Sequence, residues 1–283
     1  MAHGYGVIGS GYVGTAVAMR MKRAGLPITA TTRSVENVRE LRGLMDDVRQ
    51  LDITDPDPDL SFLAELQGLL ISVAPTRQND GYSDVFARGM RNLVGALRRR
   101  PSTQPLHITY ISSVSVYGDR QGEEVWEYSA LDSDSQVNSM LATAEELMLD
   151  IDRPDTSICV LRLGGIYGPG RDMVGMIREA AGQQVPKNGN AINAWSGLVD
   201  IARGVQFASD QKLIGIYNLV DDMQLSRREL STLICDQDGL PPVLWSYSSG
   251  ENERSMNARV SNQKIKDAGF KLMSPSMLEP AVV

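Results

Sequence analysis

A glycine-rich loop near the start of this chain has the residue types and spacing to bind phosphate groups. Gly9, Gly11 and Gly14 form a Gly-x-Gly-x-x-Gly pattern between an apolar run and a helical pattern. In that context the first glycine permits a tight turn, the second lets the backbone approach a pyrophosphate, and the third lets helix and strand pack closely. The helix start stabilises the anion. A turn without a ligand is the alternative. We predict a dinucleotide site that includes Gly9, Ser10, Gly11, Tyr12, Val13 and Gly14.

Residues at the end of the second β-rich run indicate which dinucleotide fits. An NAD site usually carries Asp or Glu there, which accepts a hydrogen bond from the ribose 2′-hydroxyl. This chain instead has Thr32, Arg33 and Ser34, and the next acid is Glu36. An arginine pairs with a 2′-phosphate, and a serine hydroxyl adds a hydrogen bond. We therefore predict NADP(H) in preference to NAD(H); the alternative is that Arg33 is a solvated loop charge.

Three further segments are predicted to contact the dinucleotide because each follows a β-rich run. Asp52 could accept a hydrogen bond from the adenine amino group, and Val73, Ala74 and Pro75 offer small side chains beside the nucleotide. The same residues fit equally well as ordinary loop ends. We also assign Ser112, at the end of a later run, to the cofactor site.

The elements that must position these residues follow from an alternation of β-rich and helical patterns. Such an alternation predicts an α/β fold, a doubly wound parallel sheet of the Rossmann type with helices on both faces. Ser34 is a typical cap for the second helix. The expected strands are 5–8, 28–32, 48–51, 69–73, 108–112, 157–163 and 216–219, and the expected helices are 13–23, 35–44, 84–100 and 137–149.

The less regular remainder of the chain predicts a second, smaller lobe. We assign residues 1–167 to the nucleotide-binding Rossmann domain, with residues 194–222 returning to it. Residues 168–193 and 223–283 are expected to form a mixed substrate lobe over the carboxyl ends of the strands. Two tryptophans, Trp195 and Trp245, either line this lobe or pack in a core.

Composition narrows the classes of function. The 283 residues are 42% hydrophobic and 22% charged, which is ordinary for a globular protein. A net charge of −7 leaves no basic surplus to neutralise phosphates, so we expect no nucleic-acid partner. No apolar run approaches the roughly 18 residues that suggest a membrane span. We expect the first strand to start by Tyr5, and hence expect no leader segment. We expect a cytoplasmic protein with a small-molecule substrate and no membrane partner.

The basic run, the cysteines and the histidines of the sequence do not predict a further functional site. The run Arg98–Arg100 falls at an expected helix end, where cations interact favourably with the helix dipole, so we expect a solvated turn. Cys159 and Cys235 lie in apolar patterns and are expected to be buried free thiols. With only two histidines, we predict neither a histidine-based triad nor a metal site.

Motifs in several segments, in order along the chain, are similar to those of one known family. Residues 111–118 read ISSVSVYG, 161–170 read LRLGGIYGPG, and 196–202 keep Asp200 but carry Gly197 where the family usually has histidine. Later segments read YNLVDD at 217–222, RVSN at 259–262 and AGF at 268–270. This set resembles the extended short-chain dehydrogenase/reductases, the NAD-dependent epimerase/dehydratase group, over essentially the whole chain. The resemblance implies the Rossmann-type fold and a nicotinamide cofactor.

The chain departs from that family where the family normally does its chemistry. Members pair a tyrosine with a lysine four residues later, and the lysine lowers the tyrosine pKa so that the phenol can exchange a proton. Aligning residues 144–147 with the family's AE-x-L motif puts Val137 and Leu141 at these positions, and a one-residue slip gives Asn138 and Ala142. No tyrosine in the chain has a lysine four residues later. The chain resembles the atypical branch of the superfamily.

Other side chains remain as candidates for catalysis. The resemblance implies that Ser113 hydrogen-bonds a substrate carbonyl or hydroxyl; alternatively its hydroxyl only satisfies backbone at a strand end. Tyr117 is the best remaining candidate for proton transfer, or it forms an aromatic wall under the nicotinamide. Ser115 and Tyr167 are weaker candidates. The acids of residues 123–132 could supply a general base or form a solvated loop.

Two hypotheses follow from these observations. The first is an NADP(H)-dependent oxidoreductase or epimerase that acts on a small hydroxyl- or carbonyl-bearing metabolite, with a sugar nucleotide as one option. The second is a non-catalytic dinucleotide sensor that reports redox state, which the missing pair favours. For oligomeric state, an apolar stripe on residues 137–149 suits a homodimer or packing on the sheet.

Overall fold

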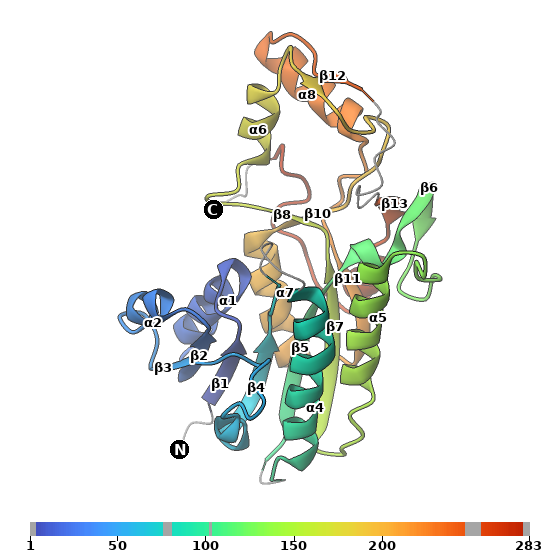
Figure 1. Ribbon diagram of the computed structural model, residues 1–283. Helices are drawn as coiled ribbons and strands as arrows, with labels where there is room; N and C mark the ends of the chain where they lie inside the picture. Colours follow the sequence, from blue (N-terminus) through green and yellow to red (C-terminus); the bar gives the residue numbers. More distant parts are fainter. Residues whose placement is uncertain (1–3, 76–80, 102–103, 247–255, 280–283) are drawn as a thin grey trace. The chain divides into compact units, whose positions relative to one another are not determined.

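The computed structural model describes residues 4–75, 81–101, 104–246 and 256–279. Its main sheet contains β1 (Gly4–Ile8), β2 (Ile28–Thr32), β3 (Asp47–Gln50), β4 (Leu66–Ile71), β5 (Leu106–Ser113), β7 (Thr156–Leu163) and β11 (Gly215–Leu219). These strands lie in the order β11-β7-β5-β4-β1-β2-β3, as Figure 1 shows. Pairing is parallel, and the strand order reverses between β1 and β4. This confirms the predicted doubly wound Rossmann-type fold.

Helices cover both faces of the main sheet. Their bounds are α1 (Tyr12–Arg23), α2 (Val35–Leu41), α3 (Gly81–Ser83), α4 (Met90–Arg99), α5 (Gln136–Leu149) and α7 (Leu198–Gln211). In Figure 1, α4 and α5 lie on one face, and α1 and α7 on the other. Because both faces are covered, the central strands are apolar without alternation: Leu69, Leu70 and Ile71 follow one another and are all fully buried.

Two expected helices differ from those observed. Helix α2 ends at Leu41 instead of residue 44, just before Gly43, a poor helix former. Its predicted cap is confirmed, because the Ser34 hydroxyl oxygen accepts a hydrogen bond from the Asn37 amide at 3.0 Å. The expected helix 84–100 starts with a wide π-helical turn, η2 (Asp84–Gly89), before α4. Gly89 lies against Ile53, whose side chain would be 2.8 Å from a Cβ at this glycine.

Several short elements were not predicted. The acidic segment expected as a loop begins as strand β6 (Asp119–Val125), which pairs with β13 (Asn257–Val260). This pairing is distant in sequence, so local patterns do not reveal it. The others are η1 (Ser61–Glu65), η3 (Val114–Tyr117), β8 (Gly165–Tyr167), α6 (Met173–Glu179), β9 (Gln184–Val185), β10 (Trp195–Gly197), α8 (Arg227–Asp238), β12 (Leu244–Trp245) and α9 (Gln263–Asp267).

The chain divides into two compact units. The first unit comprises Met1–Ser112, Ser139–Leu161 and Ile201–Tyr217, and it contains the glycine-rich loop. The second comprises Ser113–Asn138, Arg162–Asp200 and Asn218–Val283. Residues 113–138 thus belong to the second unit, whereas the sequence-based division keeps them with the first. The chain changes units where β5 and β7 end, since loops that leave these strands build the second unit.

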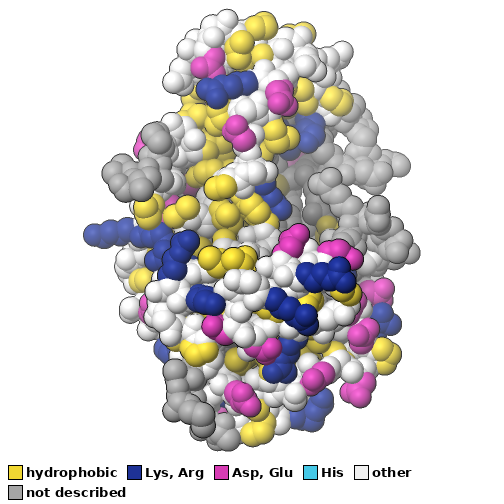
Figure 2. Space-filling model, turned by 90° about the vertical axis from the view of Figure 1, so that its left-hand side faces the viewer, with side chains coloured by type: hydrophobic (Ala, Val, Ile, Leu, Met, Phe, Trp, Pro, Cys, Tyr) yellow, Lys and Arg dark blue, Asp and Glu magenta, His cyan; other side chains and the backbone are white. Residues whose placement is uncertain are grey.

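Surface and side-chain chemistry of the described residues are simple. On the face shown in Figure 2, basic and acidic side chains are interspersed. In the described part of the chain, no helix has the length and apolar character needed to cross a membrane. No group of three or more His, Cys, Asp or Glu residues there could hold a metal ion. Cys159 and Cys235 are buried and form no disulfide bond in the described part of the chain, as predicted.

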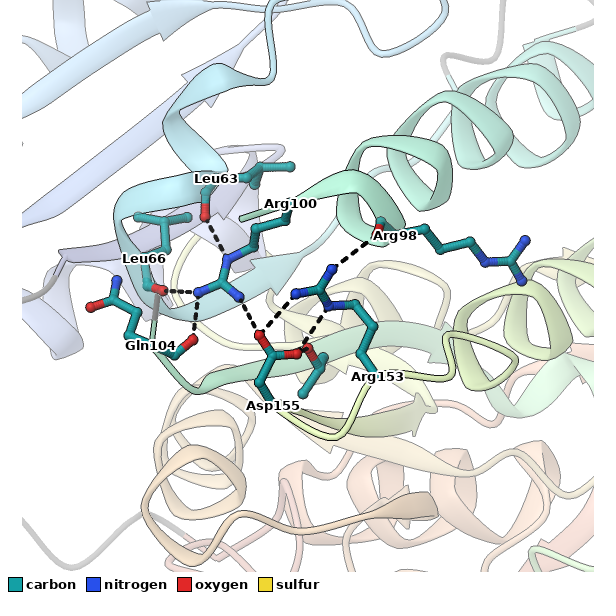
Figure 3. A network of polar contacts seen from close by, with 8 residues as sticks. Leu63, Leu66, Arg98, Arg100, Gln104, Arg153 and Asp155 are labelled. Carbon is teal, nitrogen blue, oxygen red and sulfur yellow. Dashed lines mark hydrogen bonds and ion pairs between the residues drawn. The ribbon is translucent and has the colours of Figure 1, made fainter. Parts of the chain in front are cut away.

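The prediction of a solvated turn at Arg98–Arg100 is wrong for its last residue. Arg100 is only 4% exposed, and its guanidinium donates hydrogen bonds to the carbonyl oxygens of Leu63, Leu66 and Gln104 at 3.0, 3.3 and 2.8 Å. It also forms an ion pair with Asp155 at 3.3 Å, as Figure 3 shows. The backbone leaves the helix at Arg100, with ψ of 135°, and the side chain reaches groups at the amino-terminal ends of the strands.

Other groups complete the network around Asp155. Arg153 binds the same carboxylate with two hydrogen bonds of 2.9 Å and donates to the carbonyl oxygen of Arg98. The Leu106 amide donates to the carbonyl oxygen of Asp155 at 2.8 Å. The network therefore connects the amino-terminal ends of β4, β5 and β7.

Replacing Arg100 by methionine tests this arrangement. Arg100→Met removes the guanidinium that binds three buried carbonyl oxygens and leaves Arg153 as the remaining arginine on Asp155, so we expect the free energy of unfolding to fall by about 3 kcal/mol. Arg99 is exposed and serves as the control, with a change below about 0.5 kcal/mol expected for Arg99→Met. Urea unfolding measures the free energy of unfolding of both variants. An equal loss in the two would show that the buried Arg100 has no special structural role.

Candidate functional site

Close contacts explain two of the three loop glycines. Gly9 has a φ of +92°, and a Cβ there would lie 2.4 Å from the carbonyl oxygen of Ser72. At Gly14 a Cβ would lie 2.1 Å from the carbonyl oxygen of Gly9. By contrast, a Cβ on Gly11 would meet nothing within 4 Å. Packing in the protein thus requires Gly9 and Gly14, whereas Gly11 leaves open space of the kind that a closely approaching ligand needs.

The loop is anchored to β2 and leaves polar groups available. The amides of Gly9 and Ser10 donate to the side-chain and main-chain oxygens of Thr31 at 3.3 and 2.8 Å. Ser10 is 4% exposed, yet its Oγ has no hydrogen-bond partner among the described residues. Helix α1 follows directly, and no side chain caps its start. An orphan hydroxyl beside an uncapped helix start fits a phosphate group.

The residues predicted to select the nucleotide lie at the end of β2. Arg33 is exposed, and its carbonyl oxygen accepts a hydrogen bond from Gln50 at 3.0 Å. Thr32 is buried, and its carbonyl oxygen accepts a hydrogen bond from the Leu51 amide. Ser34 already caps α2, so its oxygen is engaged while its proton remains available. The Arg33 backbone is therefore fixed while its charged side chain faces solvent.

The remaining predicted cofactor residues of the first unit follow β3 and β4 or lie at the end of β5. Asp52 Oδ1 accepts hydrogen bonds from the Thr54 amide and hydroxyl at 2.9 and 2.7 Å, so one of its oxygens closes a local turn. Val73 adjoins the glycine loop, since a Cβ on Gly9 would lie 3.2 Å from its amide nitrogen. Ala74 and Pro75 continue that segment. Because carboxyl ends of parallel strands share one edge, these segments and the glycine loop lie along the same edge.

Ser112 has a partner that the sequence reading missed. Its hydroxyl donates a 2.5 Å hydrogen bond to Glu145 Oε1, and both side chains are buried. Glu145 belongs to the AE-x-L motif in α5, so the motif offered a signal for this contact. Ser112 is therefore held by the helix that covers its strand.

The two candidate catalytic residues lie in the second unit with contrasting surroundings. The half-buried Ser113 accepts a 3.2 Å hydrogen bond from the Ser115 amide, which leaves its hydroxyl proton available. Tyr117 is completely buried: its hydroxyl donates to Asn218 Oδ1 at 2.7 Å and accepts from Arg162 at 2.9 Å. Burial raises the pKa of Tyr117, although the Arg162 charge opposes this effect. The geometry resembles that of a structural tyrosine.

Arg162 and Asn218 belong to the LRLGGIYGPG and YNLVDD motifs, and neither was predicted to be a site residue. The Arg162 guanidinium lies 5.0 Å from the centre of the Tyr117 ring and also donates to the carbonyl oxygen of Glu127. The main-chain amide of Asn218 donates a hydrogen bond to Glu127 Oε1 at 2.8 Å. Glu127, from the segment expected to supply a base or a solvated loop, instead takes part in this network.

The positions of the family's tyrosine and lysine hold no acid–base pair. Val137 is half-buried and Leu141 is buried in α5. In the shifted alignment, Asn138 is buried and donates to Asp132 Oδ2 at 2.8 Å, while its Oδ1 has no partner among the described residues. An amide neither accepts nor releases a proton near neutral pH. None of the four side chains at these positions therefore supplies an acid or a base.

A cavity of about 460 Å³ in the first unit lies elsewhere. It adjoins η1 and the end of α4, which precede β4 and β5, and so belongs to the amino-terminal edge of the sheet. Its lining includes Asp57, Asp59 and Arg99. The glycine loop lies at the opposite edge, so this cavity is not part of the predicted dinucleotide site.

Comparison with known proteins agrees with the fold. Protein YeeZ of Escherichia coli K12 is 26% identical over 281 residues, which cover 96% of each chain. A conserved protein of unknown function from Silicibacter pomeroyi superposes with a TM-score of 0.75 at 23% identity, over 97% of this chain and 95% of that one. UDP-glucose 4-epimerase of Thermus thermophilus, solved with NAD, gives 0.74 at 17% identity over 94% and 93%. At these identities the two structures show the fold alone.

A family model matches most of the sequence. The match runs from residue 7 to residue 219 and so includes the glycine loop, β5 with its VYG motif, β7 and β11. The chain belongs to the NAD dependent epimerase/dehydratase family.

Proposed function

We propose that this protein is an NADP(H)-binding oxidoreductase or epimerase of the atypical short-chain dehydrogenase/reductase type. The observation that carries the proposal is the phosphate-binding arrangement at Gly11, Ser10 and the uncapped start of α1. A bound nicotinamide would supply a hydride donor or acceptor. Family membership, and the NAD found in the epimerase structure with the same fold, support this class of cofactor.

The preference for the phosphorylated dinucleotide rests on charge at the end of β2. Arg33 is exposed on a fixed backbone, and no acid precedes Glu36 there to receive a ribose hydroxyl. The available Ser34 proton can add a hydrogen bond to a 2′-phosphate. These features favour NADP(H), and the substrate class we propose is a small hydroxyl- or carbonyl-bearing metabolite such as a sugar nucleotide.

We assign different tasks to the two candidate catalytic residues. Ser113 keeps a proton with which to hydrogen-bond a substrate oxygen. Tyr117 is already bonded to Asn218 and Arg162 and holds the backbone after Ser113 in place. In this scheme a water molecule, rather than Tyr117, delivers the proton. The same enclosed tyrosine and the empty dyad positions favour the second candidate, a dinucleotide sensor without turnover.

Removing the Arg33 guanidinium tests cofactor choice. We expect Arg33→Ala to weaken NADPH and NADP⁺ binding about 10- to 100-fold, because a charge-assisted hydrogen bond is lost, and to leave NADH and NAD⁺ unchanged. Calorimetric titration with all four dinucleotides measures this. Arg39→Ala, an exposed arginine on α2, is the control. An unchanged preference in Arg33→Ala would refute the assignment of Arg33 to a 2′-phosphate.

Replacing Ser113 tests whether the protein is an enzyme. We expect NADPH oxidation with at least one member of a panel of carbonyl metabolites, and a loss of about 100-fold in kcat for Ser113→Ala, as for other donors to a developing oxyanion. The exposed Ser61 provides a control, Ser61→Ala. Tight NADPH binding without turnover on the whole panel would instead support the sensor, whose affinities for the oxidised and reduced forms should differ.

The Tyr117→Phe variant separates positioning from proton transfer. Losing two buried hydrogen bonds should lower the free energy of unfolding by about 1–3 kcal/mol, while kcat at 20 °C changes only a few-fold. Thermal unfolding and steady-state kinetics on the same preparation measure the two effects. A Tyr117→Phe protein that folds but shows no turnover would indicate that Tyr117 itself transfers the proton.

A further inference from the structure

A short segment near the chain end is held by acids in the second unit. We call residues 273–278 the C-terminal strap. The amide of Met273 donates to both carboxylate oxygens of Asp200 at 2.9 and 3.0 Å, and that of Ser274 donates to Oδ2 at 2.9 Å. The Asp222 amide donates to the carbonyl oxygen of Pro275 at 2.8 Å. The strap backbone is thus bonded at three consecutive residues.

The strap packs against an apolar cluster of the second unit. This cluster consists of Trp195, Met223, Leu230 and Ile234, and Met277 and Leu278 of the strap pack on it. The Ser276 hydroxyl also lies 3.5 Å from the Met223 sulfur. Trp195 is 8% exposed, which confirms core packing as its role. Release of the strap would therefore expose apolar surface that includes this cluster.

Asp221 is bonded to two residues of the cluster, precedes the residue whose amide binds the strap, and has an incomplete set of hydrogen bonds. It is 2% exposed, its amide donates to the Trp195 carbonyl oxygen at 2.7 Å, and its Oδ1 accepts from the Met223 amide at 3.1 Å. Its Oδ2 has no partner among the described residues. The Tyr167 hydroxyl lies near this carboxyl group and lowers the pKa of Asp221, but it too has no hydrogen-bond partner among the described residues. A buried carboxylate in that situation is costly when charged.

The surroundings of Asp221 favour its protonated form. Burial raises its pKa from 3.8 to about 7, and the negative charges of Asp222 and Asp200 add to the effect. The nearby Lys266 and Asn262 both bind Asp222 Oδ1. Because the folded pKa exceeds the unfolded value, the stability linked to this proton is complete below about pH 4 and is lost as pH rises through about 7.

We propose that Asp221 is a proton-operated latch for the C-terminal strap, which is seated when Asp221 carries its proton and released when Asp221 ionises. Ionisation places a third negative charge beside the carboxylate that holds the Met273 and Ser274 amides and beside Asp222, whose amide holds Pro275. It also leaves a buried charged oxygen beside Met223 and Trp195 of the apolar cluster. Opening of the strap lets solvent reach that oxygen and removes both penalties.

Hydrogen exchange of the full chain tests the latch. We expect protection of the strap amides, corrected for intrinsic exchange, to fall about tenfold for each pH unit between about pH 4 and 7 in the wild type and to level off above pH 7. In Asp221→Asn, which keeps an acceptor for Met223 and cannot ionise, protection should stay constant over the same range. Asp236→Asn, an exposed acid on α8, should behave as the wild type. Constant protection in the wild type, or an equal fall in Asp221→Asn, would overturn the proposal.

The Tyr167→Phe variant provides a second test if Asp221→Asn does not fold. The Tyr167 hydroxyl lowers the pKa of Asp221, so its removal should raise the pH at which the fall in strap protection levels off. A fall that levels off at the same pH as in the wild type would show that the transition does not arise from Asp221. Both tests require neither cofactor nor substrate, so they stand apart from the proposed function.

Discussion

A buried guanidinium must be fully hydrogen-bonded, and much of the first unit depends on this constraint. Taking an arginine out of water costs several kcal/mol unless oxygens replace the lost water. Arg100 finds three carbonyl oxygens and one carboxylate, but only where β4, β5 and β7 begin side by side. This network therefore holds β4, β5 and β7 next to one another at their amino-terminal ends. At the opposite edge of the sheet the glycine loop and other loops follow the strands, and their backbone groups can bind a ligand.

The second unit satisfies a buried arginine in a different way. Arg162 lies against the Tyr117 ring and donates to its hydroxyl, and Asn218 accepts the tyrosine proton. The network uses the side chain that would otherwise be the best substitute for the missing acid–base tyrosine. Tyr117 looks reactive in isolation, but its hydroxyl is already hydrogen-bonded to both Arg162 and Asn218. Ser113, a few residues earlier, keeps an unengaged proton at the end of β5.

Local patterns predicted what local interactions determine. The strands of the main sheet, the cap at Ser34 and the strand–loop–helix context of Gly9 follow from periodicity and turn chemistry. The partners of Tyr117 and the pairing of β6 with β13 join residues far apart in sequence, so no local pattern shows them. The prediction for Arg100 was wrong because a short basic run resembles a solvated helix end. The backbone leaves the helix at Arg100, and its charged side chain is buried.

Gly11 differs from its two neighbours in what maintains it. Gly9 and Gly14 are required by contacts within the chain, so a side chain at either position conflicts with folding itself. The surroundings of Gly11 are empty, and the folded chain would accommodate a methyl group there. Substitution of Gly11 is therefore opposed only by a bound ligand and not by the fold. Among related sequences, a glycine kept at this position indicates that the loop still binds a ligand, whether or not the rest of the fold has changed.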